Sequence, residues 1–309
     1  MRHVRPLGLC LLAAFATSGV LAATSSAALP EWGRCAKVPV VVNGKTKTKG
    51  KYLDANCTEK AEGATGEYEF VKGTSEIADP EFTAVQTSAN ALLQTSQGIA
   101  VECSSTVATG RLSGTKEVSE VSVTFKGCRL PLLSFTCESN FHNEYPNKYV
   151  YDEGEIVTRG LKGTLGYISG KGTSTPSVGL SLTPTEKKGL FAEFVCGTEN
   201  SGVGVLIIRV GAKEKGGGGD SIISPIAPVN QMSTALTQTY SEKQRENPET
   251  HELEAEDGHQ EPENFENKGK DVLESEASDG FSTLGWAQAG QIETLETKLN
   301  SGEELEIKA

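Results

Sequence analysis

The chain has 309 residues, 34 of them glycine, few aromatic residues and a formal net charge of −12. This charge argues against a nucleic-acid-binding protein, because phosphate backbones are held mainly by Lys and Arg. The glycine content is typical of a β protein with many turns, and about 280 residues beyond a leader suffice for one large domain with an appendage or for two domains.

Residues 1–28 have the pattern of a secretory signal peptide. Arg2 and Arg5 precede an apolar run at 7–20, and Ser26-Ala27-Ala28 offers a small-x-small cleavage site. The run is shorter than the roughly 20 apolar residues of a membrane span, and no later stretch is long and apolar enough for one. We therefore expect a secreted protein, free outside the cell or associated with the cell envelope. Removing the two arginines takes its charge from −12 to −14.

Six cysteines remain after the leader and predict three disulfides. They are Cys35, Cys57, Cys103, Cys128, Cys137 and Cys196. An even number in an exported chain is typical of a disulfide framework, and six cysteines allow 15 pairings. We expect Cys35–Cys57, Cys128–Cys137 and Cys103–Cys196. The sequence leaves open Cys103–Cys128 with Cys137–Cys196.

Residues 29–75 predict a small amino-terminal disulfide module. Asn43-Gly44 is a turn signal, and residues 68–71 form a strand candidate that closes the unit. Between them lies a segment with Lys at 45, 47, 49 and 51. A Cys35–Cys57 bridge would close a loop of about 22 residues and contribute about 3 kcal/mol. A unit this small needs such a staple.

Residues 76–309 predict an antiparallel β-sandwich or a barrel-like body. In the clearest strand, 118–125, Val121, Val123 and Phe125 alternate with polar residues, which is the period of a strand with one buried face. The other expected strands are 82–87, 91–97, 99–103, 107–112, 133–137, 155–159, 161–168, 178–182, 190–196, 203–210, 232–240, 280–288 and 305–307. Residues 292–299 would also suit a helix, but their threonines favour a strand. Short strands separated by Gly, Pro and Ser favour a sandwich or barrel of about ten to fourteen strands.

Residues 242–279 form an acidic segment. They contain 14 Asp and Glu against four Lys and Arg, a net charge of −10. Because the segment is also poor in apolar residues, we expect a loosely ordered excursion that protrudes from the sheet. A calcium site is the strongest metal hypothesis here, from the carboxylates of Glu254, Glu256, Asp257, Glu261 and Glu263. Their spacing matches no calcium-binding loop, so no metal site is predicted.

Six stretches together resemble a group of uncharacterised secreted proteins from soil actinobacteria. They are LPEWGRC at 29–35, NCT at 56–58, FKGC at 125–128, LKGTLGYI at 161–168, FAEFVC at 191–196 and LEIKA at 305–309. The similarity covers nearly the whole mature chain. Because that group has no assigned activity, the resemblance implies a secreted protein and carries over no site residue.

Catalytic candidates are sparse in this sequence. The histidines after the leader are His142, His251 and His259. His142 lies near Asp152 and could form a base with an orienting carboxylate, but an exposed loop histidine is the favoured interpretation. No phosphate loop, serine elbow or dinucleotide fingerprint occurs. No catalytic residue, cofactor or metal ligand is therefore predicted.

We expect a non-enzymatic extracellular or cell-envelope protein that acts as a binding or structural module. The alternative is an extracellular hydrolase, acting on glycans, that uses dispersed carboxylates. A concave site with convergent carboxylates would favour the hydrolase.

Overall fold

The computed structural model describes residues 29–95, 97–139, 154–186, 189–197, 206–211, 221–246, 253–260, 265–266, 271–279 and 282–309. For 242–246 and 253–260 it describes the backbone alone. The leader expected at 1–28 lies outside the described residues. Within the described residues, no helix is long and apolar enough to cross a membrane.

Nearly all regular structure in the described chain is β-strand, as expected. A short 3-10 turn, η1 (Glu62–Ala64), interrupts the first strands, which are β1 (Glu31–Lys37), β2 (Val40–Val42), β3 (Lys45–Lys47) and β4 (Tyr68–Lys72). The next strands are β5 (Glu81–Gln86), β6 (Ala91–Thr95), β7 (Ala100–Cys103), β8 (Ser105–Leu112), β9 (Glu117–Lys126), β10 (Arg129–Leu130), β11 (Phe135–Ser139), β12 (Ile156–Val157), β13 (Leu161–Ser169) and β14 (Ser177–Pro184). The last are β15 (Ala192–Cys196), β16 (Leu206–Gly211), β17 (Ile222–Ala227), β18 (Leu236–Tyr240), β19 (Glu242–Glu246), β20 (Leu253–Gln260), β21 (Glu274–Ser278), β22 (Thr283–Leu299) and β23 (Glu306–Lys308).

Eight antiparallel strands close into a barrel. Their order is β22, β5, β8, β9, β13, β14, β17 and β18, and β18 pairs again with β22. Closure removes the free edges at which a sheet could pair with another chain. An eight-stranded barrel has an interior that side chains can fill or that can hold one small ligand. Of the two body architectures expected, the structure therefore has the barrel.

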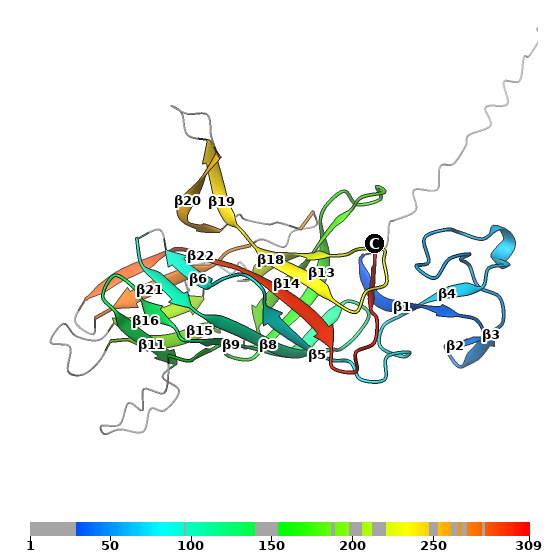
Figure 1. Cartoon of the computed structure of the whole chain (residues 1–309), viewed down its shortest axis with the longest axis horizontal. Helices are drawn as coiled ribbons and strands as arrows, with labels where there is room; N and C mark the ends of the chain where they lie inside the picture. The colour runs from blue at the N-terminus through cyan, green and yellow to red at the C-terminus, as the bar shows by residue number, and fades with distance from the viewer. Residues whose placement is uncertain are drawn as a thin grey trace, which may run out of the picture.

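Strand β22 is 17 residues long and also belongs to a second ring of strands. Its residues 295–299 pair with β5, whereas residues 289–292 pair with β6. From β6 the pairing continues through β7, β10, β11, β15, β16 and β21 back to β22. The strand runs along the length of the body (Figure 1). The main sheet has 16 strands, more than the ten to fourteen expected.

Alternation explains why the carboxyl-terminal half of β22 is a strand. Ala289, Leu295 and Leu299 are buried, and they share one face with the buried polar residues Glu293 and Thr297. A spacing of two residues along one face is the strand period. The strand interpretation of 292–299 is therefore confirmed, and the polar residues on the inner face explain why the apolar pattern also suited a helix.

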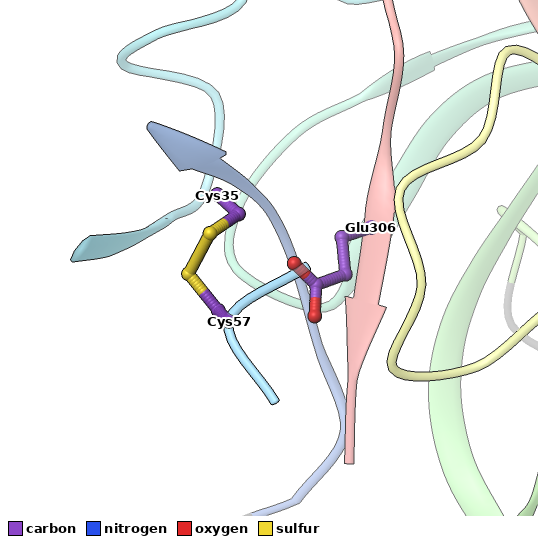
Figure 2. Close-up of side chains that lie close together, drawn as sticks. All are labelled: Cys35, Cys57 and Glu306. Carbon is purple, nitrogen blue, oxygen red and sulfur yellow. A yellow bond between two sulfur atoms is a disulfide. The ribbon is translucent and has the colours of Figure 1, made fainter. Parts of the chain in front are cut away.

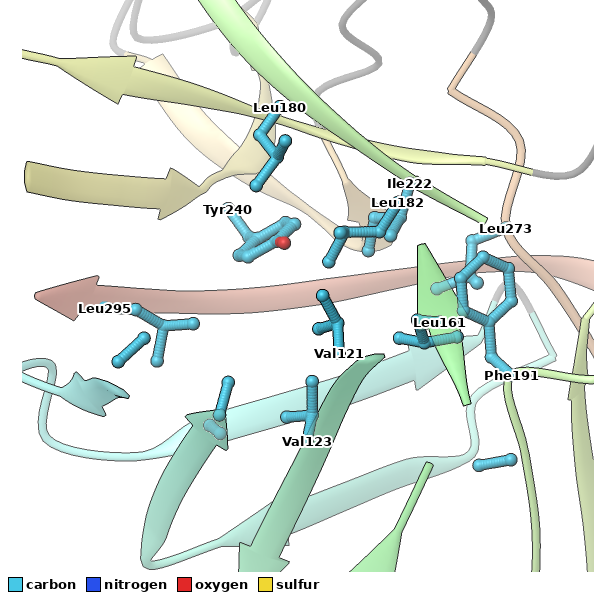
Figure 3. Packing of buried hydrophobic residues seen from close by; sticks show 14 of the residues in the cluster. Val121, Val123, Leu161, Leu180, Leu182, Phe191, Ile222, Tyr240, Leu273 and Leu295 are labelled. Atoms are coloured by element: carbon cyan, nitrogen blue, oxygen red, sulfur yellow. The ribbon is translucent and has the colours of Figure 1, made fainter. Parts of the chain in front are cut away.

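One hydrophobic core passes through both rings. Val121 and Val123 of β9 lie inside it, as their alternation in the sequence predicted. Leu182 of β14, Tyr240 of β18 and Leu295 of β22 contribute to the same cluster (Figure 3). The two rings are therefore held together by a continuous interior as well as by β22.

The two ends of the described chain meet in a three-stranded sheet, here called the terminal sheet. β1 pairs with β4 on one side and with β23 on the other, so the expected amino-terminal module also includes residues 306–308. Trp32 of β1 is 2% exposed and lines a small cavity with Phe82 and Leu305 where the barrel meets this sheet. The terminal sheet therefore covers one end of the barrel (Figure 1).

The acidic segment 242–279 does not leave the sheet as one unit. β19 and β20 pair only with each other in the described part, and their hairpin stands out from the body (Figure 1). The chain returns at 265–266, where the Phe265 ring covers Gly166 so closely that a Cβ there would lie 2.5 Å from it. β21 then pairs with β16 and β22 inside the second ring. It fits because its acids alternate with buried Ser275 and Ala277.

Candidate ligand-binding site

Four of the six predicted disulfide cysteines lie in one row across the second ring. Cys137 is opposite Cys196 in the register of β11 and β15, and the register of β10 places Cys128 between Cys103 and Cys137. The structure joins Cys103 to Cys128 and Cys137 to Cys196, each pair with a Cα–Cα distance of 4.0 Å. The expected pairs Cys128–Cys137 and Cys103–Cys196 are therefore wrong, and the pairing that the sequence left open is present.

Backbone hydrogen bonding explains this choice of partners. Opposite residues of antiparallel strands alternate between hydrogen-bonded and non-hydrogen-bonded pairs, and Cβ atoms are closer in the second kind. The Cys137 amide donates to the Cys128 carbonyl at 2.9 Å, so these two form the hydrogen-bonded kind. The pairs Cys103–Cys128 and Cys137–Cys196 are then non-hydrogen-bonded pairs, whose Cβ atoms are closer together.

The third disulfide, Cys35–Cys57, is the pair expected from the sequence. The Glu306 carboxylate lies beside it, and the ligand atoms of the three residues fall within 4.8 Å of one another (Figure 2). A metal would need thiolates, whereas both sulfur atoms are joined in the disulfide. Burial raises the pKa of Glu306, and Lys308, 3.2 Å from the carboxylate, opposes this rise. We therefore treat this cluster as part of the terminal sheet's structure.

A cavity of about 80 Å³ lies inside the body, where the barrel and the second ring meet. Its wall is mainly apolar and includes Ala84 and Ala108. Val123, Leu182 and Phe191 also line it, and Figure 3 shows these three within the core. The volume exceeds that of two water molecules, at about 30 Å³ each, and is below the roughly 150 Å³ of a cavity that binds benzene. The cavity therefore suits a molecule larger than water and smaller than benzene.

Polar side chains of β18 and β22 border this cavity. Tyr240 and Gln291 line it, and Glu293 is the register partner of Tyr240. The Gln291 side-chain amide donates to Glu293 Oε1. Glu293 is only 2% exposed. An acidic group is thus enclosed in the barrel next to an apolar space.

Several polar atoms in this region lack a hydrogen-bond partner among the described residues. They are Glu293 Oε2 and the hydroxyl oxygens of Thr106 and Ser224. Burial raises the pKa of Glu293 to about 7, although the nearby Thr106 hydroxyl and the Gln291 amide favour its ionised form. Buried polar groups without partners mark places for water, an ion or a ligand.

A second hollow, here called the terminal groove, opens on the terminal sheet and measures about 730 Å³. Lys47, Lys51, Tyr52 and Phe70 are among its walls. Lys47 and Lys51 both pair with the Glu69 carboxylate, at 2.9 and 3.4 Å. Burial opposes ionisation of Glu69, but the two lysines outweigh it and lower its pKa. Glu69 is therefore a counter-ion and not a suitable proton donor.

The histidine and calcium candidates fall outside what the structure describes. His142 and His251 lie outside the described residues, and only the backbone of His259 is described. Of the five acidic calcium candidates, Glu254, Glu256 and Asp257 are described by their backbone alone, and Glu261 and Glu263 are not described at all. These hypotheses stay predictions.

Glu293 has no sequence motif that marks it as a site residue. In a chain with 41 Asp and Glu, one more glutamate carries no signal. Its place in the strand pattern could have indicated burial, because a strand at 289–299 puts Glu293 on the same face as Leu295 and Leu299. Assigning that face to the interior would have marked it as a buried acid.

Comparison with known proteins adds no relative. No protein-family model, no curated protein and no solved structure matches the chain. The resemblance to secreted actinobacterial proteins thus stays a prediction, and the functional argument rests on geometry.

Proposed function

We propose that this chain is an extracellular, non-enzymatic binding protein that takes a small, largely apolar molecule into the barrel interior. The observation that carries the proposal is the 80 Å³ apolar cavity, whose polar wall residues Tyr240 and Gln291 are the neighbours of the buried Glu293 carboxyl. Ligand sites are typically apolar concavities with a few polar groups that fix orientation. A location outside the cell is supported by the leader-like residues 1–28 and by three disulfides, which persist in oxidising surroundings.

The hydrolase alternative has weaker support. A glycosidase needs a carboxylic acid with a raised pKa facing a second carboxylate across the sugar. Of the two described carboxylates with raised pKa, Glu293 lies in the barrel and Glu306 in the terminal sheet. A sugar ring, with about twelve non-hydrogen atoms, is also larger than the 80 Å³ cavity holds.

Binding of four-carbon probes tests the proposal. We expect at least one of n-butanol, n-butylamine and butyrate to raise the thermal unfolding temperature of the oxidised mature protein. Ligands of this size bind weakly, so concentrations in the millimolar range are needed. At about ten times Kd the expected stabilisation is about 1.4 kcal/mol.

A cavity-filling variant locates the binding. Ala108 lines the cavity, so Ala108→Leu should fill it and abolish probe binding while the protein stays folded. Ala55→Leu, at an exposed position, is the matched control and should bind as before. If no probe binds the unmodified protein, the barrel interior is not the site. The same follows if the Ala108→Leu variant binds the probes as tightly as the unmodified protein does.

Charge distribution favours a second candidate function, attachment to an anionic polymer of the cell envelope through the terminal groove. Residues 29–75 carry eight Lys and Arg against six Asp and Glu, a net charge of +2. Residues 76–309 carry 19 against 35, a net charge of −16. An acidic protein would therefore approach an anionic polymer with its terminal sheet first.

Retention on immobilised polyphosphate tests this second function. Lys51 and Lys72 line the groove and keep their ammonium groups largely in solvent. We expect Lys51→Gln with Lys72→Gln to lower the salt concentration at which the protein elutes. The control pair Lys162→Gln with Lys171→Gln, on exposed positions of the body, should elute unchanged. Equal elution of both variants would remove the terminal groove from consideration.

A further inference from the structure

Glu293 is a buried acid for which the described residues provide no basic partner. None of the groups that act on its carboxyl is a Lys, Arg or His, and one of its oxygens makes no hydrogen bond to the described residues. An ionised carboxylate enclosed in this way is costly, by several kcal/mol, unless a positive charge or further donors compensate for it. The described groups that act on Glu293 supply neither, so the acid keeps its proton up to about pH 7 unless a compensating group comes from outside them.

The described groups that act on Glu293 or on its register partner are neutral or acidic. β18 contributes Tyr240, and burial raises the pKa of that phenol, so it stays protonated near neutral pH. β8 contributes Thr106, and β22 itself contributes Gln291. Beyond Tyr240 lies Asp271, whose negative charge acts on the same phenol. A cation entering this region would therefore meet the Glu293 carboxylate and, beyond the Tyr240 phenol, the negative charge of Asp271.

We propose that the ligand of the barrel interior is a small alkylammonium ion, with its ammonium group at Glu293 and its hydrocarbon chain in the cavity. This inference rests on the proposed function, because it names the ligand class of the same site. The geometry points to a cation because the cavity wall is apolar, while one oxygen of the Glu293 carboxyl next to Tyr240 and Gln291 has no hydrogen-bond partner among the described residues.

The chemistry of an ammonium group matches two of the unpartnered atoms and the phenol beside them. Its three N–H donors would have Glu293 Oε2 and the oxygens of Thr106 and Tyr240 as acceptors. A hydrogen bond to an ionised acceptor contributes more than one to a neutral acceptor, by roughly a factor of two. The hydrocarbon part would meet Ala108, Val123 and their apolar neighbours. A neutral alcohol fits the apolar part equally well but lacks the charge.

The test compares n-butylamine with n-butanol and butyrate at about pH 8, a pH at which the Glu293 carboxyl is mostly ionised and the amine is still protonated. Binding is measured by calorimetry and by ligand-observed NMR, with ammonium chloride at equal concentration as the ionic control. We expect n-butylamine to bind about tenfold tighter than n-butanol, and butyrate most weakly. In Glu293→Gln this preference should vanish while n-butanol still binds.

The outcomes separate this inference from the proposed function. If n-butanol binds as tightly as n-butylamine, or if Glu293→Gln keeps the preference, the cation inference is wrong and the binding function stands. If none of the three probes binds the unmodified protein, both are wrong.

A measurement on the unmodified protein guards against a variant that fails to fold. The carbon-13 resonance of the Glu293 carboxyl, followed as the pH is varied, reports its ionisation directly. Bound n-butylamine should move this titration to lower pH, because a nearby positive charge favours the ionised form. n-Butanol should not move it. A titration that is unaffected by saturating n-butylamine would overturn the inference.

Discussion

At the scale of single residues, Glu293 links the stability of the fold to pH. Its pKa is about 7 in the folded protein against an ordinary value of 4.5. Below 4.5 the carboxyl is protonated in both states and has no effect. As the pH rises toward 7 the unfolded chain releases the proton first, so the folded state loses stability, and the loss is complete above 7. The difference corresponds to about 3 kcal/mol.

Glu293→Gln should remove this dependence. We expect the variant to be more stable than the unmodified protein by up to about 3 kcal/mol at about pH 8, and nearly equal to it at about pH 4. Denaturant unfolding at both pH values measures the effect. Glu296→Gln, on the same strand with a partly exposed side chain paired with Lys298, is the control. Parallel pH profiles for Glu293→Gln and the unmodified protein would contradict the assignment.

The cysteine row predicts which disulfide matters most for stability. Cys137–Cys196 closes a separation of 59 residues and Cys103–Cys128 one of 25. Replacing Cys137 and Cys196 by Ala should lower the free energy of unfolding by about 4 kcal/mol, against about 3.5 kcal/mol for the other pair. Chemical unfolding of both double variants measures this order. Peptide maps of the unreduced protein should link Cys103 to Cys128, and a fragment that joins Cys128 to Cys137 would contradict the row.

At the scale of elements, β22 is the strand on which both rings depend. It pairs with β5 and β18 in the barrel and with β6 and β21 in the second ring. No other strand is common to both closed rings in the described pairing. Damage to its inner face should therefore weaken the barrel and the second ring together.

Leu295→Ala tests this dependence. Leu295 is 3% exposed and lines the 80 Å³ cavity inside the body. Truncation enlarges that cavity and should lower the free energy of unfolding by about 2–5 kcal/mol. Leu284, on the same strand but 58% exposed, is the matched control, and Leu284→Ala should change stability by less than about 0.5 kcal/mol. Unfolding followed by circular dichroism compares the two. Equal effects would show that the inner face of β22 is not what holds the rings.

Local patterns predicted the strands but not how they close. The alternation around Val121 and Val123 is visible in the sequence because each strand's face is fixed by a period of two. Closure of β18 onto β22 depends on which distant strands meet, and that information is not local. The disulfide partners were missed for the same reason. Which neighbour Cys128 faces is decided by strand register, and the short loop to Cys137 pointed to the wrong one.

At the scale of the whole molecule, the two ends of the described chain stabilise each other. β23 pairs with β1, and Ile307 on it is completely buried. The Trp32 amide donates to the Thr115 carbonyl at 2.6 Å, which attaches the terminal sheet to the loop between β8 and β9. β23 is not one of the eight strands whose pairing closes the barrel. The terminal sheet should therefore be separable from the barrel.

Deleting residues 305–309 tests this separation. The deletion removes β23 and the buried Leu305, so the remaining pair β1–β4 loses one edge partner and Trp32 loses part of its cover. We expect Trp32 fluorescence, measured in a Trp286→Phe background, to shift to longer wavelength, and proteolysis within 37–72 to accelerate. The strand signal of the barrel in circular dichroism should remain, because all eight of its strands precede the deletion. Glu304→Ala, at an exposed position just before β23, should leave both readouts unchanged. Loss of the barrel signal together with the Trp32 shift would mean that the terminal sheet and the barrel fold as one unit.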